Sequence, residues 1–448
     1  MDSVHEVGDH FKTVEIEKGI TYRYLPHSKW KTLSIDVFCR VPLKRETVTQ
    51  VALIPRLMRR GTRSYPTLRD ISRYLEGLYG ASMGADANKI GPEQVVRFGI
   101  DLPSPAFLSY GPPGGSDGDF ESLNLAKAMS FIWEVATEPY LEGGAFPKDR
   151  FETEREEHRR DILSLRNDRP RYATIRIVEE LSRGSDGGLP SWGVLDDLPE
   201  LDSHKIWETW TGVLSSSPIS IYVIGERAEE LGDILGRVRL RFPKPRQEDH
   251  VFHTKTAPPK PPASLLEIEE SLPGEQTQVC QAFHIGITEN HPQLAAAIVF
   301  DGILGGFPHS KLFVNVREKN SMAYFASSSF NSWRGIVLTA AGVDDRLRHR
   351  ARDLITAQVE AMKRGEITDE ELDNTKIGLV RRLRSESDSQ SALVRRRLTR
   401  EIMGGMASPE ELVERILRVT KDDVVSVAEN AQLKAVYMLR AKDDGGNV

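Results

Sequence analysis

Three side chains that can hold a metal ion fall within one turn of an expected helix. Glu154, Glu157 and His158 stand at positions i, i+3 and i+4, a spacing that places them on one helix face. The set supplies only one histidine and lies in a run of charges typical of a solvated face. A self-sufficient metal-dependent hydrolase built on this cluster is therefore an alternative to a plain surface helix.

Four other histidines lack partners at ligand spacing. His250 and His253 lie in a proline-rich segment without further ligands nearby, which indicates a stray surface pair. His284 and His309 have no partner in the sequence, and each is interpreted as a hydrogen-bonded structural residue.

Three glycines at 302, 305 and 306 resemble a phosphate-binding loop. No Lys-Ser or Lys-Thr pair follows them, although such a pair would be needed to bind phosphate and a metal. A helix C-cap followed by a tight turn is the favoured interpretation of Gly302, Gly305 and Gly306.

Composition limits the class of protein. The chain has 448 residues, which predicts more than one domain. Its 39% hydrophobic and 28% charged residues are typical of a soluble globular protein, and its net charge of −6 predicts no general affinity for nucleic acid. Cys39 and Cys280 fall in separate expected strands, so neither a disulfide framework nor a thiolate metal site is predicted. The polar start of the chain and the absence of a long apolar run predict a cytoplasmic protein without a membrane span.

The first half of the sequence is predicted to contain both strands and helices. Residues 33–41 alternate apolar and polar side chains, which predicts a strand with one buried face. A helix is expected at 48–59, ending at Gly61, and a second begins after the cap residue Thr67. The remaining expected elements are strands at 96–100 and 219–224 and helices at 122–137 and 147–166.

The order of elements then repeats beyond a proline-rich segment. Residues 242–263 contain too much proline for a helix or a central strand, and we interpret them as a linker between residues 1–241 and 264–448. After it come, in the earlier order, a strand at 279–287, helices at 292–304 and 311–319, a strand at 336–341, a charged helix opened by a Thr368 capping box, and a strand at 435–439. The sequence thus predicts an α+β protein of two homologous α/β halves, each a mixed sheet backed by helices.

Several segments resemble a known peptidase family. Those that carry the resemblance are 53–62 (LIPRLMRRGT) and 75–80 (LEGLYG) in the first half, and 304–306 (LGG), 310–313 (SKLF), 316–319 (VREK) and 323–324 (AY) in the second. They resemble the insulinase, pitrilysin and mitochondrial processing peptidase family, which implies that the two halves form a clamshell around a cavity. Residues 43–49 (LKRETVT) and 74–81 (YLEGLYGA) further resemble a bacterial subgroup associated with 5-aminopentanol modification of elongation factor P.

The resemblance implies a zinc site that this chain does not keep. Active members of the family carry H-x-x-E-H on the first helix, where two histidines bind zinc and the glutamate is the general base. Alignment on Gly61 places Ala52, Pro55 and Arg56 at the three motif positions. Alanine has no donor atom, proline cannot act as a base and arginine carries a fixed positive charge, so no metal is expected in this chain.

Other family positions are partly kept. The third zinc ligand falls at Asp161, with Glu157 as the alternative, and Met83 stands where the family often has an asparagine that meets substrate. Arg317 and Tyr324 keep the seven-residue spacing of the pair that reaches the zinc site from the second half. The resemblance implies that both hydrogen-bond the substrate carbonyl and stabilise its developing negative charge.

The expected function follows from the loss of the zinc motif together with the retention of the Arg317 and Tyr324 pair. The chain is interpreted as the zinc-free, noncatalytic subunit of a heterodimeric peptidase whose partner bears H-x-x-E-H and the zinc ion, and it would hold an extended peptide. The alternative is an adaptor or peptide holder without proteolysis in a protein modification or maturation pathway. Neither hypothesis involves nucleic acid or a membrane.

Overall fold

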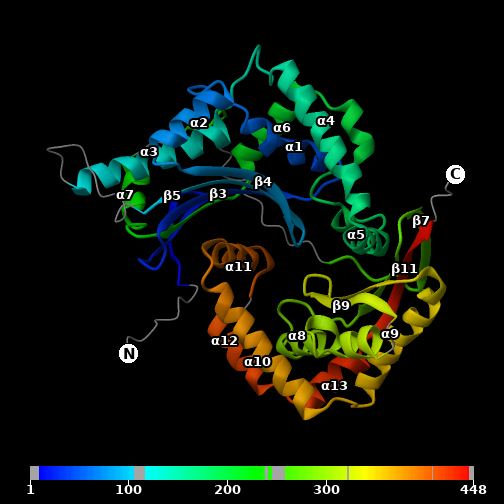
Figure 1. Ribbon diagram of the computed structural model, residues 1–448. Helices are drawn as coiled ribbons and strands as arrows, with labels where there is room; N and C mark the ends of the chain where they lie inside the picture. Colours follow the sequence, from blue (N-terminus) through cyan, green and yellow to red (C-terminus); the bar gives the residue numbers. More distant parts are fainter. Residues whose placement is uncertain are drawn as a thin grey trace. The chain divides into compact units, whose positions relative to one another are not determined.

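The computed structural model describes residues 10–104, 117–237, 241–244, 258–319, 322–405 and 407–442, which form two compact units (Figure 1). The N-terminal unit takes the described residues of His10–Ile162 and Leu189–Thr256. The C-terminal unit takes those of Leu163–Gly188 and Ala257–Val448. The division does not follow chain order, because Leu163–Gly188 packs with the later part of the chain.

The N-terminal unit is a six-stranded sheet with helices. Its elements are β1 (Lys12–Glu17), β2 (Ile20–Pro26), β3 (Thr32–Pro42), α1 (Val48–Met58), α2 (Leu68–Gly77), β4 (Ser82–Ile90), β5 (Glu93–Pro103), α3 (Asp117–Thr137), α4 (Lys148–Ser164), η4 (Leu195–Glu200), α6 (Ser203–Ser216), β6 (Ile219–Gly225) and α7 (Glu230–Arg237). The strand order is β1-β2-β6-β3-β5-β4, so β4 is an edge strand.

The C-terminal unit is built around a five-stranded sheet. Its elements are η2 (Leu165–Asn167), α5 (Arg169–Leu181), η3 (Asp186–Gly188), β7 (Leu266–Pro273), β8 (Thr277–His284), α8 (Leu294–Asp301), η6 (Gly302–Gly306), η7 (Phe313–Glu318), β9 (Ala323–Asn331), β10 (Ile336–Val343), η8 (Asp345–Leu347), α9 (Arg348–Lys363), α10 (Asp369–Glu386), α11 (Gln390–Met403), α12 (Pro409–Arg418), α13 (Lys421–Glu429) and β11 (Gln432–Lys442). The strand order is β7-β11-β8-β10-β9.

The two sheets repeat one topology. β2 pairs with β6 in parallel and β7 pairs with β11 in parallel, whereas the other pairs, β6-β3-β5-β4 and β11-β8-β10-β9, are antiparallel. β4 and β9 therefore occupy corresponding edges. The repeated α/β order expected from the sequence is confirmed, with β1 as an additional strand on the first sheet.

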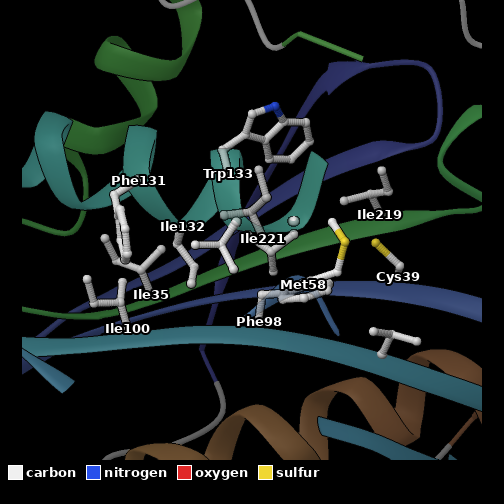
Figure 2. Packing of buried hydrophobic residues seen from close by; sticks show 14 of the residues in the cluster. Ile35, Cys39, Met58, Phe98, Ile100, Phe131, Ile132, Trp133, Ile219 and Ile221 are labelled. Carbon is white, nitrogen blue, oxygen red and sulfur yellow. The ribbon is translucent and has the colours of Figure 1, made fainter. Parts of the chain in front are cut away.

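Helix side chains fill the N-terminal core from one face of the sheet. Phe131, Ile132 and Trp133 of α3 lie over Ile35 and Ile221 of the central strands (Figure 2). All five side chains are at most 5% exposed, which accounts for the apolar alternation along β3. Cys39 also lies in this core as a free thiol.

The other face of β3 is buried as well, so the expectation of only one buried face is wrong. Asp36 is 2% exposed, and Arg97 of β5 donates to its Oδ1 at 2.7 Å. Arg40 forms a two-bond ion pair with Glu93 at 2.7 and 2.9 Å. These buried polar residues are tolerated because they form hydrogen bonds and ion pairs with one another. The alternation of apolar and polar residues along one strand does not show such pairing with a neighbouring strand.

The C-terminal sheet is covered on both faces. Helices α8, α9 and α13 form one core, and α5 closes the opposite face with Ala173 and Ile177 against the strands. Arg169, in the first turn of α5, donates to the carbonyl oxygens of Leu272, Pro273, Gln276 and Leu439 at 2.7–3.1 Å. A segment that precedes residue 189 in the chain thereby completes the C-terminal unit.

Most of the expected helix signals are confirmed. Thr67 and Thr368 each form a capping box at the start of α2 and α10. The helix expected at 292–304 is shorter, because α8 ends at Asp301 and continues as the π-helical turn η6. Within the described ranges, no helix is long and apolar enough to cross a membrane.

Candidate functional site

Helix α1 carries Ala52, Pro55 and Arg56, the three residues that the resemblance predicts at the zinc-motif positions. Ala52 is 5% exposed and packs in the core, and Pro55 lies inside the helix, where it has no N–H to donate. Arg56 is half-buried at the last turn of α1. The local reason for this helix is its apolar surface, since nearly every residue from Val48 to Met58 is buried.

The guanidinium of Arg56 is held by carboxylates of α4. Its Nη2 donates to Asp161 and its Nη1 lies 3.4 Å from Oε2 of Glu154. Arg60, one turn later, donates to the other oxygen of Glu154 and lies 3.6 Å from Glu157. The structure therefore brings together Arg56 and Asp161, the two candidate positions of opposite charge, and neutralises the arginine with no metal ion.

Glu154 and His158 do not lie on a solvated face, so that part of the sequence interpretation is wrong. Glu154 is 0% exposed and is stabilised by two arginines, Arg56 and Arg60, from α1 and the residues just after it. This network was missed because the arginine pair and the carboxylates are about a hundred residues apart. The i, i+4 spacing of the arginines was the one available signal.

His158 is a structural residue of this network. Its Nε2 lies 2.7 Å from the carbonyl oxygen of Trp192, and since a carbonyl only accepts, this nitrogen carries the proton. Burial lowers the pKa of His158, and the nearby charge of Arg56 lowers it further. The ring is thus neutral and fixed by Trp192, with Nδ1 buried and without a hydrogen-bond partner.

These residues do not fit a metal site. In the part of the chain that the structure describes, no group of three or more His, Cys, Asp and Glu side chains is arranged to hold a metal ion. Glu154 and Asp161 are instead engaged by guanidinium groups, and the positions predicted for the two histidines of the family motif carry Ala52 and Arg56. No zinc-dependent step can be built on this unit.

Strand β4 lies at the sheet edge with a charged pair on one face. Met83 points the other way and packs, half-buried, against the N-terminal core. Arg97 bridges from Asp36 to Asp86 of β4, 3.3 Å from the latter. Gly99 makes room for this bridge, since a Cβ there would lie 2.3 Å from Oδ1 of Asp36. Burial raises the pKa of Asp36 to about 6, and Arg97 opposes that shift.

Arg317 and Tyr324 belong to the C-terminal unit and are both exposed. Arg317 lies in the π-helical turn η7, with its guanidinium carbon 4.6 Å from the centre of the Phe313 ring. Tyr324 is 66% exposed. The register between β9 and β10 shifts from Phe325↔Gly342 to Ala323↔Val343, which leaves Tyr324 as the extra residue of a β-bulge. Bulges redirect side chains at sheet edges, and this one turns a large aromatic residue away from the core.

The remaining candidates have structural roles or fall outside the structure. His309 is confirmed as a structural residue, with its Nε2 3.0 Å from Oγ1 of Thr375. His284 is the last residue of β8, where burial lowers its pKa. His250 and His253 lie outside the described residues, as does most of the expected linker.

The chain is similar to known proteins over most of its length. The family profile described as "Peptidase M16 inactive domain" matches residues 214–379. The "Probable inactive metalloprotease YmfF" of Bacillus subtilis is 27% identical over 426 residues, which are 95% of this chain and 96% of the relative. A crystal structure of a conserved protein from Enterococcus faecalis matches 97% of this chain and 100% of its own at 27% identity, with a TM-score of 0.84.

The fold is shared more widely. A crystal structure of a peptidase M16 inactive domain from Pseudomonas fluorescens covers 97% of this chain and 98% of its own with a TM-score of 0.74 at 17% identity. The α+β class with two helix-backed sheets is thereby confirmed as the insulinase-like fold. The chain thus has the insulinase-like fold and is similar over nearly its whole length to a protein described as a probable inactive metalloprotease.

The surroundings of Ala52, Pro55 and Arg56 do not favour zinc binding. The positions that the resemblance predicts for the zinc motif hold a core alanine, a helical proline and an arginine that α4 already neutralises. A single substitution cannot restore zinc binding there, because the donors of α4 would still face a guanidinium or an empty position.

Proposed function

We propose that this insulinase-like protein is the zinc-free subunit of a two-chain peptidase. Its partner would carry H-x-x-E-H with the zinc ion, and this chain would help to hold an extended peptide. The observation that carries the proposal is a contrast: the positions of the zinc motif are closed by the Arg56–Asp161 pair, whereas Arg317 and Tyr324 stay exposed.

Arg317 and Tyr324 have the chemistry for the partner's reaction. A guanidinium and a phenol both donate hydrogen bonds, and both can stabilise a carbonyl oxygen that gains negative charge. The β-bulge at Tyr324 and the surface position of Arg317 support this role, because neither side chain is needed to pack the core.

The experiment is reconstitution with a partner. The chain is purified together with the product of a neighbouring gene that carries H-x-x-E-H, and cleavage of fluorescein-labelled casein is measured. Loss of each donor should lower kcat by about 10²–10³, so Arg317→Ala with Tyr324→Phe should abolish measurable cleavage. Arg381→Ala and Tyr79→Phe serve as matched controls, since both residues are exposed and lie outside the proposed pair.

Two outcomes count against the proposal. Full activity of the double variant would remove Arg317 and Tyr324 from the reaction. A complex that binds casein without cutting it would favour the second candidate, an adaptor that holds peptide in a modification or maturation pathway such as that of elongation factor P.

A further inference from the structure

The stretch 381–400, which covers the end of α10 and most of α11, is strongly basic. It contains seven arginines, two acidic residues and no lysine, although the whole chain has a net charge of −6. We call it the arginine hairpin, and both of its helices belong to the C-terminal unit (Figure 1). A local excess of positive charge on an otherwise acidic protein attracts anionic partners. The seven arginines are Arg381, Arg382, Arg384, Arg395, Arg396, Arg397 and Arg400.

One ion pair joins the two helices of the arginine hairpin. Nη2 of Arg396 donates to Oε2 of Glu386 at 2.6 Å, and the Arg396 side chain is only 11% exposed. Because this pair ties α11 to the end of α10, Arg395 and Arg397 on either side of Arg396 also lie close to that end. The arginines of the two helices are therefore gathered toward the turn that joins them.

Three arginines of the hairpin lack an acidic partner within the described ranges. The side chains of Arg381, Arg395 and Arg397 form no hydrogen bond or ion pair with any described residue. Arg381 and Arg395 are exposed, and Arg397 is half-buried. Helix α4, which is also highly charged, instead pairs three of its arginines with glutamates of the same helix. The arginine hairpin thus presents cations that its own unit does not neutralise.

Helix stability does not account for these arginines. A cation in the last turn of a helix interacts favourably with the helix dipole, which explains Arg384 at the end of α10. Arg395 and Arg397 lie in the middle of α11, where that interaction has decayed. Arg396 and Arg400 are four residues apart, a spacing at which like charges destabilise a helix. The repeated arginines therefore weaken the isolated helix and call for a role outside it.

The side-chain chemistry favours carboxylates of a protein over the phosphates of a nucleic acid. A guanidinium binds either group through two parallel hydrogen bonds, which a lysine cannot do. The arginine hairpin contains no aromatic residue on which a base could stack. Acidic first turns also flank it, with Asp369, Glu370 and Glu371 in α10 and Glu410 and Glu411 in α12. A nucleic acid carries a phosphate at every step and would meet these carboxylates, whereas a compact acidic surface need not.

We propose that the arginine hairpin is a docking surface for a carboxylate-rich surface of another protein. Arg381, Arg395 and Arg397 would supply guanidinium groups that are not already paired, while the Arg396–Glu386 pair holds the two helices together. This surface is separate from Arg317 and Tyr324 in the chain, and the proposal does not depend on the peptidase role.

The test measures binding of a fluorescein-labelled oligoglutamate of about twelve residues to the full chain by fluorescence anisotropy in about 50 mM NaCl. Replacing Arg381, Arg395 and Arg397 together by Gln should weaken binding by about tenfold, because each exposed pair contributes a fraction of that change. Arg381→Ala alone should change the affinity by less than about threefold. Replacing the same three arginines by Glu should remove measurable binding.

The matched control replaces three exposed arginines of the N-terminal unit by Gln, which changes the net charge equally. It should alter the affinity by less than about twofold. The control residues are Arg59, Arg69 and Arg73.

Four outcomes overturn the proposal. Equal weakening in the two Gln variants would assign binding to net charge alone, and unchanged affinity in the folded hairpin variant would remove the arginines from it. Tighter binding of a random-sequence RNA duplex of about 20 base pairs, lost in the hairpin variant, would make nucleic acid the occupant. A dimer seen by light scattering that dissociates in the hairpin variant would make a second copy of the chain the occupant.

Discussion

Nη1 of Arg56 lies 3.4 Å from Oε2 of Glu154, a carboxylate with no exposed surface. A buried carboxylate is costly unless it is paired, and here the pairing comes from Arg56 on one oxygen and Arg60 on the other. Arg56, which the resemblance predicts at a zinc-ligand position, is therefore a structural residue of this unit.

Replacement of this arginine should destabilise the protein. In Arg56→Ala, Glu154 keeps only Arg60, and Asp161 loses its partner. We expect the free energy of unfolding to fall by about 1–3 kcal/mol in urea denaturation. Arg59→Ala is the control, because Arg59 is exposed at the same helix end and should change stability by less than about 0.5 kcal/mol. Equal stability of the two variants would show that the network contributes nothing.

A second prediction concerns the segment that crosses to the C-terminal unit. Arg169→Ala leaves four backbone carbonyls without their donor, and we expect a loss of about 2–4 kcal/mol in the free energy of unfolding. Arg171→Ala, on the exposed side of the same helix, should be neutral. Hydrogen exchange of β7 and β11 should speed up only in the Arg169 variant. Protection that stays unchanged in both would argue against α5 as a part of this unit's core.

Sequence periodicity predicted the repeated order of strands and helices because each half buries an apolar sheet face under helices. Ile35 and Ile221 are two residues of that buried face in the N-terminal unit. It could not assign α5, since Ala173 and Ile177 are too few to show which sheet they cover. It also missed the second buried face of β3, where Asp36 and Arg97 satisfy each other across two strands.

The candidate site was predicted only in part. Family alignment placed Arg56 and Asp161 at related positions, and the structure joins them. The pairing of Glu154 with Arg60 was missed, because a charged residue on a polar helix is expected to be solvated until its partner elsewhere in the chain is known. The bulge at Tyr324 depends on the register between β9 and β10, which a single strand does not encode.

Two adjacent glycines offer a third prediction. Gly305→Ala places a methyl group 2.3 Å from the nitrogen of Ser328, so η6 must move away from β9. We expect a loss of about 2–3 kcal/mol or failure to fold. At Gly306 the nearest atom to a new Cβ is 3.4 Å away, and Gly306→Ala should be tolerated. Thermal unfolding of both variants is the measurement, and equal midpoints would contradict the close approach.

The last prediction concerns pH. Burial raises the pKa of Asp301 from 3.8 to about 6, and the hydroxyl of Ser328 opposes that shift. Below pH 4 the carboxyl is protonated in both the folded and the unfolded chain. Between pH 4 and 6 the folded chain keeps the proton and the unfolded chain releases it, so the free energy of unfolding falls as the pH rises.

About one pH unit above the folded pKa, this contribution to the free energy of unfolding becomes constant. Asp301→Asn removes the titration while keeping an acceptor for the hydroxyl of Ser328. Urea denaturation of both proteins across pH 4–7 should therefore show the wild type losing about 2 kcal/mol relative to the variant, most of it below pH 6. Asp36, whose pKa is raised in the same direction, is present in both proteins and cancels in the difference. Parallel pH profiles would mean that the carboxyl of Asp301 is ionised throughout this range in the folded chain.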